Sequence, residues 1–203
     1  MSVRRVIIFF LLILFLSSVP GYSYRILYAE QFYRLYHRHF TMYPEDCLEN
    51  IYYLEQALRA DFANPLNAVA RDIETPQQWE RYRYLFSMHV NLKLVELYLM
   101  LGSKYDKFHA YFYNAPFRRQ NLESLEIAQE SYEYALVYWE EALSWAEQAW
   151  SVPYFHLEEI QYWEDESTRI YNGDLDYGEI INDHLDRLES VRRAFEEMDE
   201  DTY

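Results

Sequence analysis

Apolar residues return at helical spacing along most of the chain, most clearly between residues 117 and 150. There they recur at steps of three and four, and acidic residues fall largely between them. One apolar stripe with an acidic side is typical of an amphipathic helix. The stripe consists of Leu122, Leu125, Ala128, Tyr132, Ala135, Leu136, Trp139, Ala142, Leu143, Ala146 and Trp150. Such a helix would be about 50 Å long.

Helix-start and helix-stop residues separate the periodic segments. Thr75-Pro76-Gln77-Gln78 places an N-cap, a proline at the first helical position and a glutamine at the third, which together indicate a capping box. Other signals of this kind are Pro44 before two acidic residues, Asn114 before Pro116, Ser151 before Pro153, Gly102 after an apolar run, and Asn172-Gly173. The prolines indicate helix starts, and the glycines indicate helix ends.

These boundaries predict six helices and no strands. The helices are expected at about 25–40, 45–61, 77–101, 117–150, 154–171 and 176–198. No stretch alternates strictly between apolar and polar residues between turn signals, so β-structure is not supported. Leu92–Leu101 is apolar almost all round, which places it at the centre of the expected core. The fold class is therefore all-α.

A weak internal repeat suggests how the helices pack. Ala135, Trp139 and Ala142-Leu143 fall at offsets 0, +4 and +7/+8, the spacing of the second helix of a tetratricopeptide repeat. A fainter copy of this second-helix pattern occurs at 51–61, and the matching first-helix pattern occurs at Leu94, Tyr98 and Gly102. We therefore expect antiparallel helical hairpins stacked as a degenerate tetratricopeptide-like domain, with residues 103–121 inserted between paired helices. An unrelated helical bundle is the alternative, because the same spacing arises in any packed helix.

The N-terminal residues have the pattern of an export signal. Arg4 and Arg5 precede the apolar run Val6–Leu16, and Gly21 and Ser23 supply small residues for cleavage. We predict that residues 1–23 form a signal peptide, 24–198 a single helical domain and 199–203 an acidic tail. The alternative is an uncleaved membrane anchor, although the run is short for a span of about 20 residues. No later stretch approaches that length, so no stable membrane insertion is expected after cleavage.

Composition narrows the function classes. The 203 residues carry a net charge of −16 and one cysteine, Cys47, which excludes an internal disulfide and a cysteine-based zinc cluster. Residues 24–119 have a net charge of +1, whereas residues 120–203 have −19. This acidity argues against nucleic-acid binding, which needs basic residues. The acidic half either keeps the protein soluble, forms a surface for a basic partner, or repels anionic membrane surfaces. Cys47 is expected to be buried.

No catalytic, cofactor or metal site is predicted. His37 and His39 point to different helix faces, and His156 with Glu159 lacks a second pair of ligands. Residues 172–183 resemble a calcium loop, with Asn172, Asp174, Asp176 and Asp183 as ligands, but the sixth position is Tyr177 rather than glycine. An ordinary helix–helix turn is the better interpretation. No nucleophile motif or Gly-rich phosphate loop occurs, so an enzyme is not expected.

Three segments resemble a family of known proteins. They are Tyr82–Leu92, Leu101–Lys107 and Ala110–Phe117. They are similar to a family of small, tetratricopeptide-like spirochaetal periplasmic proteins associated with the collar of the periplasmic flagellar motor. The resemblance covers about residues 45–150 and implies a periplasmic, non-enzymatic assembly component with a role in motility. It agrees with the export signal, and it carries no catalytic or binding residues with it.

The inserted segment supplies the predicted partner-binding site. Aromatic rings combined with arginines are enriched in interface hot spots. The residues are Tyr105, Phe108, Tyr111, Phe112, Tyr113, Phe117, Arg118 and Arg119. Two interpretations stay open, because the segment either folds back to cap the open end of the helical stack or forms a docking surface for another envelope protein.

The sequence therefore predicts a protein-binding scaffold with periplasmic or flagellar motor proteins as partners, and a homo-oligomer stays open. The alternative is a tetratricopeptide-like periplasmic adaptor for a solute-binding or transport system. That role needs a ligand-sized cavity or pore between helices.

Overall fold

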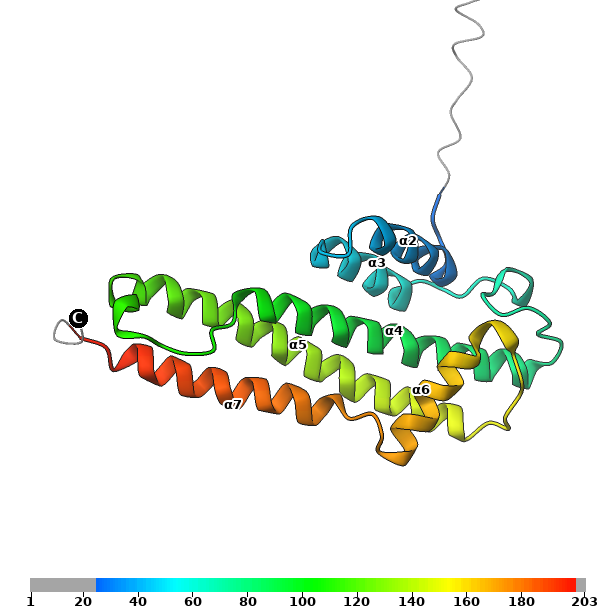
Figure 1. Ribbon diagram of the computed structural model, residues 1–203. Helices are drawn as coiled ribbons and strands as arrows, with labels where there is room; N and C mark the ends of the chain where they lie inside the picture. Colours follow the sequence, from blue (N-terminus) through cyan, green and yellow to red (C-terminus); the bar gives the residue numbers. More distant parts are fainter. Residues whose placement is uncertain (1–24, 200–203) are drawn as a thin grey trace, which may run out of the picture.

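The computed structural model describes residues 25–199, which form helices joined by loops (Figure 1). The α-helices are α2 (Ala29–Met42), α3 (Cys47–Arg59), α4 (Pro76–Tyr105), α5 (Arg118–Trp150), α6 (Gln161–Asn172) and α7 (Tyr177–Glu196). The short 3₁₀ helices are η1 (Pro65–Asn67), η2 (Phe112–Phe117) and η3 (Glu158–Ile160). No strand forms within residues 25–199, so the predicted all-α fold of about six helices is confirmed. The predicted signal peptide and residues 200–203 of the tail lie outside the described part.

Apart from α6, the helices lie roughly antiparallel to the neighbours on which they pack. Figure 1 shows α4 and α5 as a long central hairpin, with the α2–α3 pair against α4 and α7 along the opposite side of α5. The short α6 crosses the end of the hairpin at which α4 begins. Helices α4 and α5 contain 30 and 33 residues. Each is nearly as long as a whole tetratricopeptide repeat of about 34 residues, so this hairpin is larger than one repeat of that family.

The centre of the core lies earlier on α4 than the sequence suggested. Every residue from Leu85 to Leu92 is buried, whereas Leu99, Met100 and Leu101 of the predicted central run are only partly buried. The reason is that α6 packs on the first half of α4 and inserts Trp163, which is completely buried. The buried run includes three polar residues, which the apolar pattern passed over.

One predicted helix start is confirmed in atomic detail. The Thr75 hydroxyl accepts a hydrogen bond from the Gln78 amide at 3.2 Å. The Gln78 side chain in turn accepts from the Thr75 amide at 2.9 Å. Both halves of the capping box are therefore present, and α4 begins at Pro76.

Two other predicted helix-start signals are wrong, although α5 begins only one residue after the predicted 117. Pro116 lies inside η2, and Phe117 precedes α5 without any side-chain cap. Ser151 ends α5 instead of starting the next helix, and α6 begins at Gln161, not 154. The segment after Ser151 stays irregular because Arg81 of α4 binds the carbonyl oxygens of Ala149 and Val152 at 2.6 and 2.7 Å, which ties it to α4.

Gly102 was expected to end a helix, but it lies within α4. Helix α4 continues to Tyr105, and Gly102 is buried against the Tyr132 ring of α5. A Cβ atom at this position would lie only 2.4 Å from the Tyr132 Cε1 atom. The glycine therefore allows α4 and α5 to approach closely. Helix α4 ends three residues later, at Tyr105, with Asp106 as its C-cap.

The remaining boundary residues behave as expected. Gly173 has φ +75°, ends α6 in a left-handed conformation and leaves Asp176 to cap α7 through the Glu179 amide at 3.2 Å. Cys47 is buried, as predicted. Among residues 25–199, no helix combines the length and the apolar character needed to cross a membrane.

Candidate functional site

The predicted partner-binding residues lie at the turn between α4 and α5, which we call the aromatic segment (residues 105–119). Figure 1 places this turn at the end of the long hairpin remote from α6. Phe108, Phe112, Tyr113 and Phe117 are each about 59–69% exposed, and Tyr105 and Tyr111 are 37% and 45% exposed. The rings are not buried against the helices, so they present an apolar surface to solvent.

The exposed rings are ordered among themselves. Tyr111 and Tyr113 stack with centroids 5.1 Å apart and planes 10° apart. Phe112 meets Tyr113 edge to face at 5.9 Å. These geometries are the favoured arrangements of aromatic pairs. A partner would therefore meet a preformed group of rings on η2.

Asp106 anchors the start of the segment. Its nearly buried carboxylate accepts hydrogen bonds from the Tyr132 hydroxyl of α5, at 3.0 Å, and from Arg187 of α7. The Arg187 guanidinium also lies over the Phe108 ring, 4.4 Å from its centroid. Burial, and then the Asp106 charge, raises the pKa of Tyr132, which stays protonated as a donor. The turn is thus fixed to two helices at its first residues.

The two arginines of the segment have different environments. Arg118 donates to the carbonyl oxygen of Met198 at 2.5 Å, which links the start of α5 to the chain after α7. Arg119 is 84% exposed and only approaches Glu123, at 3.5 Å. Of the two arginines, Arg119 is the exposed one and pairs only within its own helix, whereas Arg118 holds the local structure.

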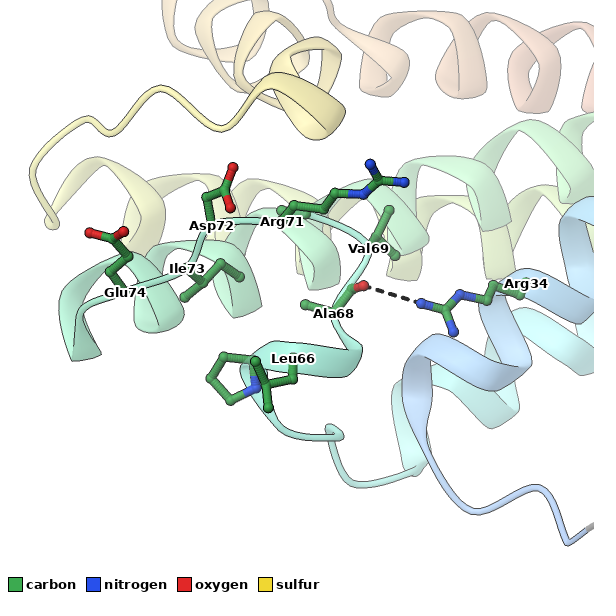
Figure 2. A pocket seen from close by; sticks show the side chains of 10 residues that line it. Arg34, Leu66, Ala68, Val69, Arg71, Asp72, Ile73 and Glu74 are labelled. Atoms are coloured by element: carbon green, nitrogen blue, oxygen red, sulfur yellow. Dashed lines mark hydrogen bonds between the residues drawn. The ribbon is translucent and has the colours of Figure 1, made fainter.

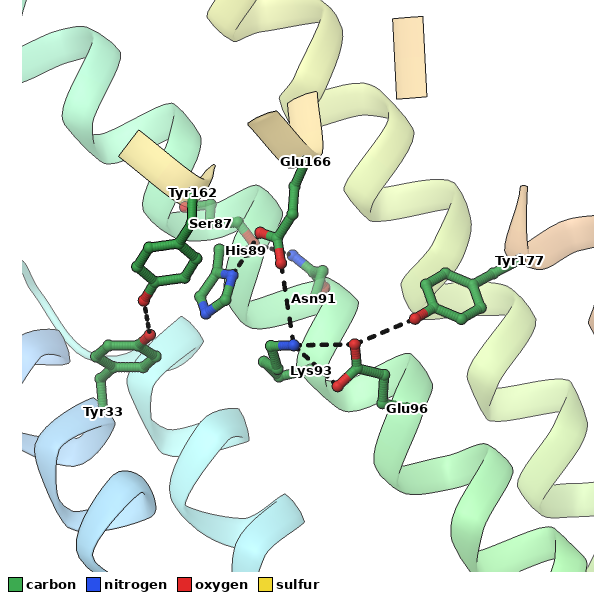
Figure 3. A network of polar contacts seen from close by, with 9 residues as sticks. All are labelled: Tyr33, Ser87, His89, Asn91, Lys93, Glu96, Tyr162, Glu166 and Tyr177. Carbon is green, nitrogen blue, oxygen red and sulfur yellow. Dashed lines mark hydrogen bonds and ion pairs between the residues drawn. The ribbon is translucent and has the colours of Figure 1, made fainter. Parts of the chain in front are cut away.

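A second group of polar residues, which sequence analysis missed, joins three helices. Figure 3 shows His89 and Lys93 of α4 approaching Glu166 of α6, with Nδ1–Oε2 and Nζ–Oε1 distances of 2.6 and 3.9 Å. Lys93 also pairs with Glu96 at 2.9 Å, and the Tyr177 hydroxyl of α7 donates to Glu96 at 3.1 Å. The signal for this group in the sequence was that His89, Lys93 and Glu96 interrupt the largely apolar helix α4.

His89 is the most enclosed member of this network. It is completely buried, stacks on Trp163 at 5.1 Å and has no hydrogen-bond partner at Nε2. Burial lowers the pKa of His89, against the opposing effect of Glu166. Among the described residues no Ser, Thr or Cys side chain bonds to the ring, so the pair is not arranged as a nucleophile and its base.

A buried ion pair lies near the same end of the hairpin. Arg81 forms a two-pronged contact with Glu164 of α6, at 2.7 Å from Nε and 2.5 Å from Nη2. Both side chains are about 95% buried or more. With its two carbonyl contacts, Arg81 uses its donors to join α4, the end of α5 and α6. These contacts use four of the five N–H groups of Arg81, so the guanidinium serves mainly to hold the three helices together.

A pocket of about 560 Å³ lies along the loop between α3 and α4 (Figure 2). Arg34 reaches across from α2 and donates to the carbonyl oxygens of Asn67 and Ala68 at 3.0 and 3.1 Å. Figure 2 shows the Asp72 and Glu74 carboxylates farther along the loop, away from the Arg34 guanidinium. The charged side chains of this pocket do not converge on one point.

The residues that the sequence suggested as possible metal ligands make other contacts. His37 packs on Tyr33, and His39 Nδ1 lies 3.0 Å from Asn50 Oδ1. Glu159 binds the Arg71 amide at 3.0 Å, and Asp176 caps α7. Within residues 25–199 no three His, Cys, Asp or Glu side chains are grouped to hold a metal ion.

Comparison with protein-family models identifies a family over much of the chain. The model of the family described as Domain of unknown function (DUF8513) matches residues 77–198. This range runs from the first turn of α4 through α7, and it includes the aromatic segment. No curated protein and no solved structure matches the chain.

Proposed function

The chain belongs to the DUF8513 family, a domain of unknown function that spans α4 to α7 here. Because this family has no described function, we propose a role from the residues exposed on the protein surface. The protein is a non-enzymatic scaffold of the periplasm that binds other envelope proteins through the aromatic segment. A long, well-packed hairpin presents this segment at its end, as a scaffold requires.

One observation carries the proposal: six aromatic rings are exposed on a turn that Asp106 and Arg187 hold in place. Exposed apolar clusters are unusual on proteins that work alone and typically mark interaction sites. Aromatic anchors fixed before binding also lose little conformational freedom when a partner arrives. Arg119 adds an exposed donor beside the rings.

The proposed place of action is the collar of a spirochaetal periplasmic flagellar motor. The support is the sequence resemblance over residues 82–117, together with the export pattern of residues 1–23. The adaptor for a transport system is the other outcome of the test below.

The test is crosslinking in cells of origin, followed by affinity purification and mass spectrometry. We expect flagellar motor or collar proteins, crosslinked within residues 105–119. The triple variant Tyr111→Ala, Phe112→Ala and Arg119→Glu should reduce their recovery at least tenfold, because removal of an interface hot spot costs about 2 kcal/mol or more.

The matched control replaces exposed apolar residues elsewhere, Leu48→Ala and Leu66→Ala, which are 68% and 95% exposed. This control should bind normally. Undiminished recovery with the triple variant would refute the docking role. Recovery of transport components alone would replace the collar assignment with the adaptor.

A further inference from the structure

A second pocket, distinct from the aromatic segment, lies where α3 and α5 flank α4. Its volume is about 300 Å³. Helix α3 contributes Glu55, Leu58 and Arg59, α4 contributes Ser87 and Asn91, and α5 contributes Tyr138, Glu141 and Trp145. This volume is at the lower end for small-molecule sites, which suits a single side chain better than a large ligand.

The floor of the pocket contains an unsatisfied acceptor. Asn91 is only 1% exposed, and its Nδ2 atom donates to the Ser87 carbonyl oxygen at 2.8 Å. Its Oδ1 atom has no hydrogen-bond partner in the structure. Buried acceptors are normally paired, since an unpaired one is costly. The floor therefore offers a hydrogen bond to an incoming N–H donor.

The α5 wall of the pocket is aromatic. The rings of Tyr138 and Trp145 line it, and Tyr84 continues the surface with its centroid 6.0 Å from that of Trp145. The Tyr138 hydroxyl donates to Glu55 at 2.9 Å, which fixes the ring. Ring faces attract cations, and tryptophan does so most strongly.

The charges at the mouth favour a cation as well. Glu55 is already paired with Arg59 at 2.9 Å and also accepts from the Tyr98 hydroxyl. Glu141 belongs to α5, as the two rings do; it is exposed and has no partner among the described residues. One carboxylate thus stays uncompensated beside two aromatic rings, within the strongly acidic half of the chain.

We propose that this pocket binds the lysine or arginine side chain of an extended basic segment of a partner protein. The cationic group lies between Glu141 and the rings of Tyr138 and Trp145, and one of its N–H groups donates to Asn91 Oδ1. The pocket and the aromatic segment share no residue, so the two can be tested separately.

The test uses ¹⁵N-labelled protein made from the full-length sequence and nuclear magnetic resonance titration. The probes are the capped pentapeptides Gly-Gly-Lys-Gly-Gly and Gly-Gly-Arg-Gly-Gly. We expect saturable shifts of the Asn91 side-chain amide and the Trp145 indole N–H. The same peptide with norleucine in place of lysine should bind at least tenfold more weakly, because it keeps the chain but loses the charge.

Variants at exposed positions separate binding from folding. Glu141→Gln should weaken the lysine peptide about threefold, as expected for one exposed ion pair. The control, Glu140→Gln, removes an equal charge from the neighbouring exposed position, which does not line the pocket. Equal loss in both variants, equal binding of the norleucine peptide, or no shift at Asn91 and Trp145 would each overturn the proposal. None of these results bears on the aromatic segment.

Discussion

At the scale of single residues, Gly102 sets how closely α4 and α5 approach. Replacement by alanine would bring a methyl group within 2.4–2.9 Å of three atoms of the Tyr132 ring. Overpacking of this kind costs about 1–3 kcal/mol, which exceeds the gain of up to about 1 kcal/mol from better helix propensity. We predict that Gly102→Ala lowers the free energy of unfolding by about 1–2 kcal/mol, measured by urea denaturation.

The neighbouring Ser103 provides the control for Gly102. Ser103 is exposed, and its hydroxyl bonds only to the Met100 carbonyl oxygen of its own helix. Ser103→Ala should change stability by less than about 0.5 kcal/mol. If Gly102→Ala stabilises the protein as a surface helix substitution would, the close contact with Tyr132 does not limit packing.

Gly102 also shows the limit of sequence analysis for single residues. The capping box at Thr75 was predictable, because both partners lie within four positions of one another. The role of Gly102 was not, because it depends on Tyr132, thirty positions later and on another helix. Local bonds can be derived from spacing, whereas contacts between helices require their relative placement.

At the scale of the elements, the Arg81–Glu164 pair decides how α6 is held. Glu164→Gln removes one charge and leaves a buried guanidinium uncompensated. Breaking a buried pair in this way typically costs about 3–5 kcal/mol. We predict a loss of this size in thermal or urea unfolding, together with faster amide hydrogen exchange in α6 than in α7.

The exposed pair of Arg71 and Glu159 is the comparison. Arg71 is 83% exposed, and its Nε atom lies 3.5 Å from the Glu159 carboxylate. Arg71→Ala should cost no more than about 1 kcal/mol, as surface pairs do. Similar losses for Glu164→Gln and Arg71→Ala would mean that burial adds nothing to the Arg81 contact.

The elements themselves were mostly predictable, and the exception is instructive. The two long helices were expected near their observed bounds because their apolar period is continuous. The start of α6 was misplaced by seven residues, from 154 to Gln161. Pro153 correctly indicated that a helix ends nearby. The contacts of Arg81 with the carbonyl oxygens of Ala149 and Val152 keep the segment that follows from forming a helix.

At the scale of the whole molecule, the buried His89 makes stability depend on pH. Burial lowers the pKa of His89 below its ordinary value of about 6.5, so the unfolded chain takes up a proton before the folded one. Stability is therefore complete above pH 6.5 and falls as the pH drops, by at most about 1.4 kcal/mol per unit from this group. Glu166, Lys93 and Glu96 are the charged groups that act on it.

Urea unfolding at pH 7.5 and pH 5.0 checks this expectation. His89→Gln keeps a donor toward Glu166 but does not titrate, so its stability should change less over this range than that of the natural chain. His156→Gln, at an exposed position, should behave like the natural chain. Equal pH dependence of all three proteins would contradict a role for His89.

The two proposed interaction surfaces were predictable to different degrees. The aromatic segment was found in the sequence because its rings are consecutive in the chain and do not follow the helical period. The pocket beside Asn91 was not found, because its residues come from three helices and each one alone resembles a normal helix position. The number of chain segments that build a site therefore limited its prediction.

The length of α4 has a mechanical consequence. A straight helix of 30 residues extends about 45 Å, α5 runs alongside it, and α7 packs along α5. The aromatic segment lies at one end of α4, and the Arg81–Glu164 ion pair lies near the other end. A partner bound to the aromatic segment, as we propose, would therefore lie about 45 Å from the α6 end of the hairpin.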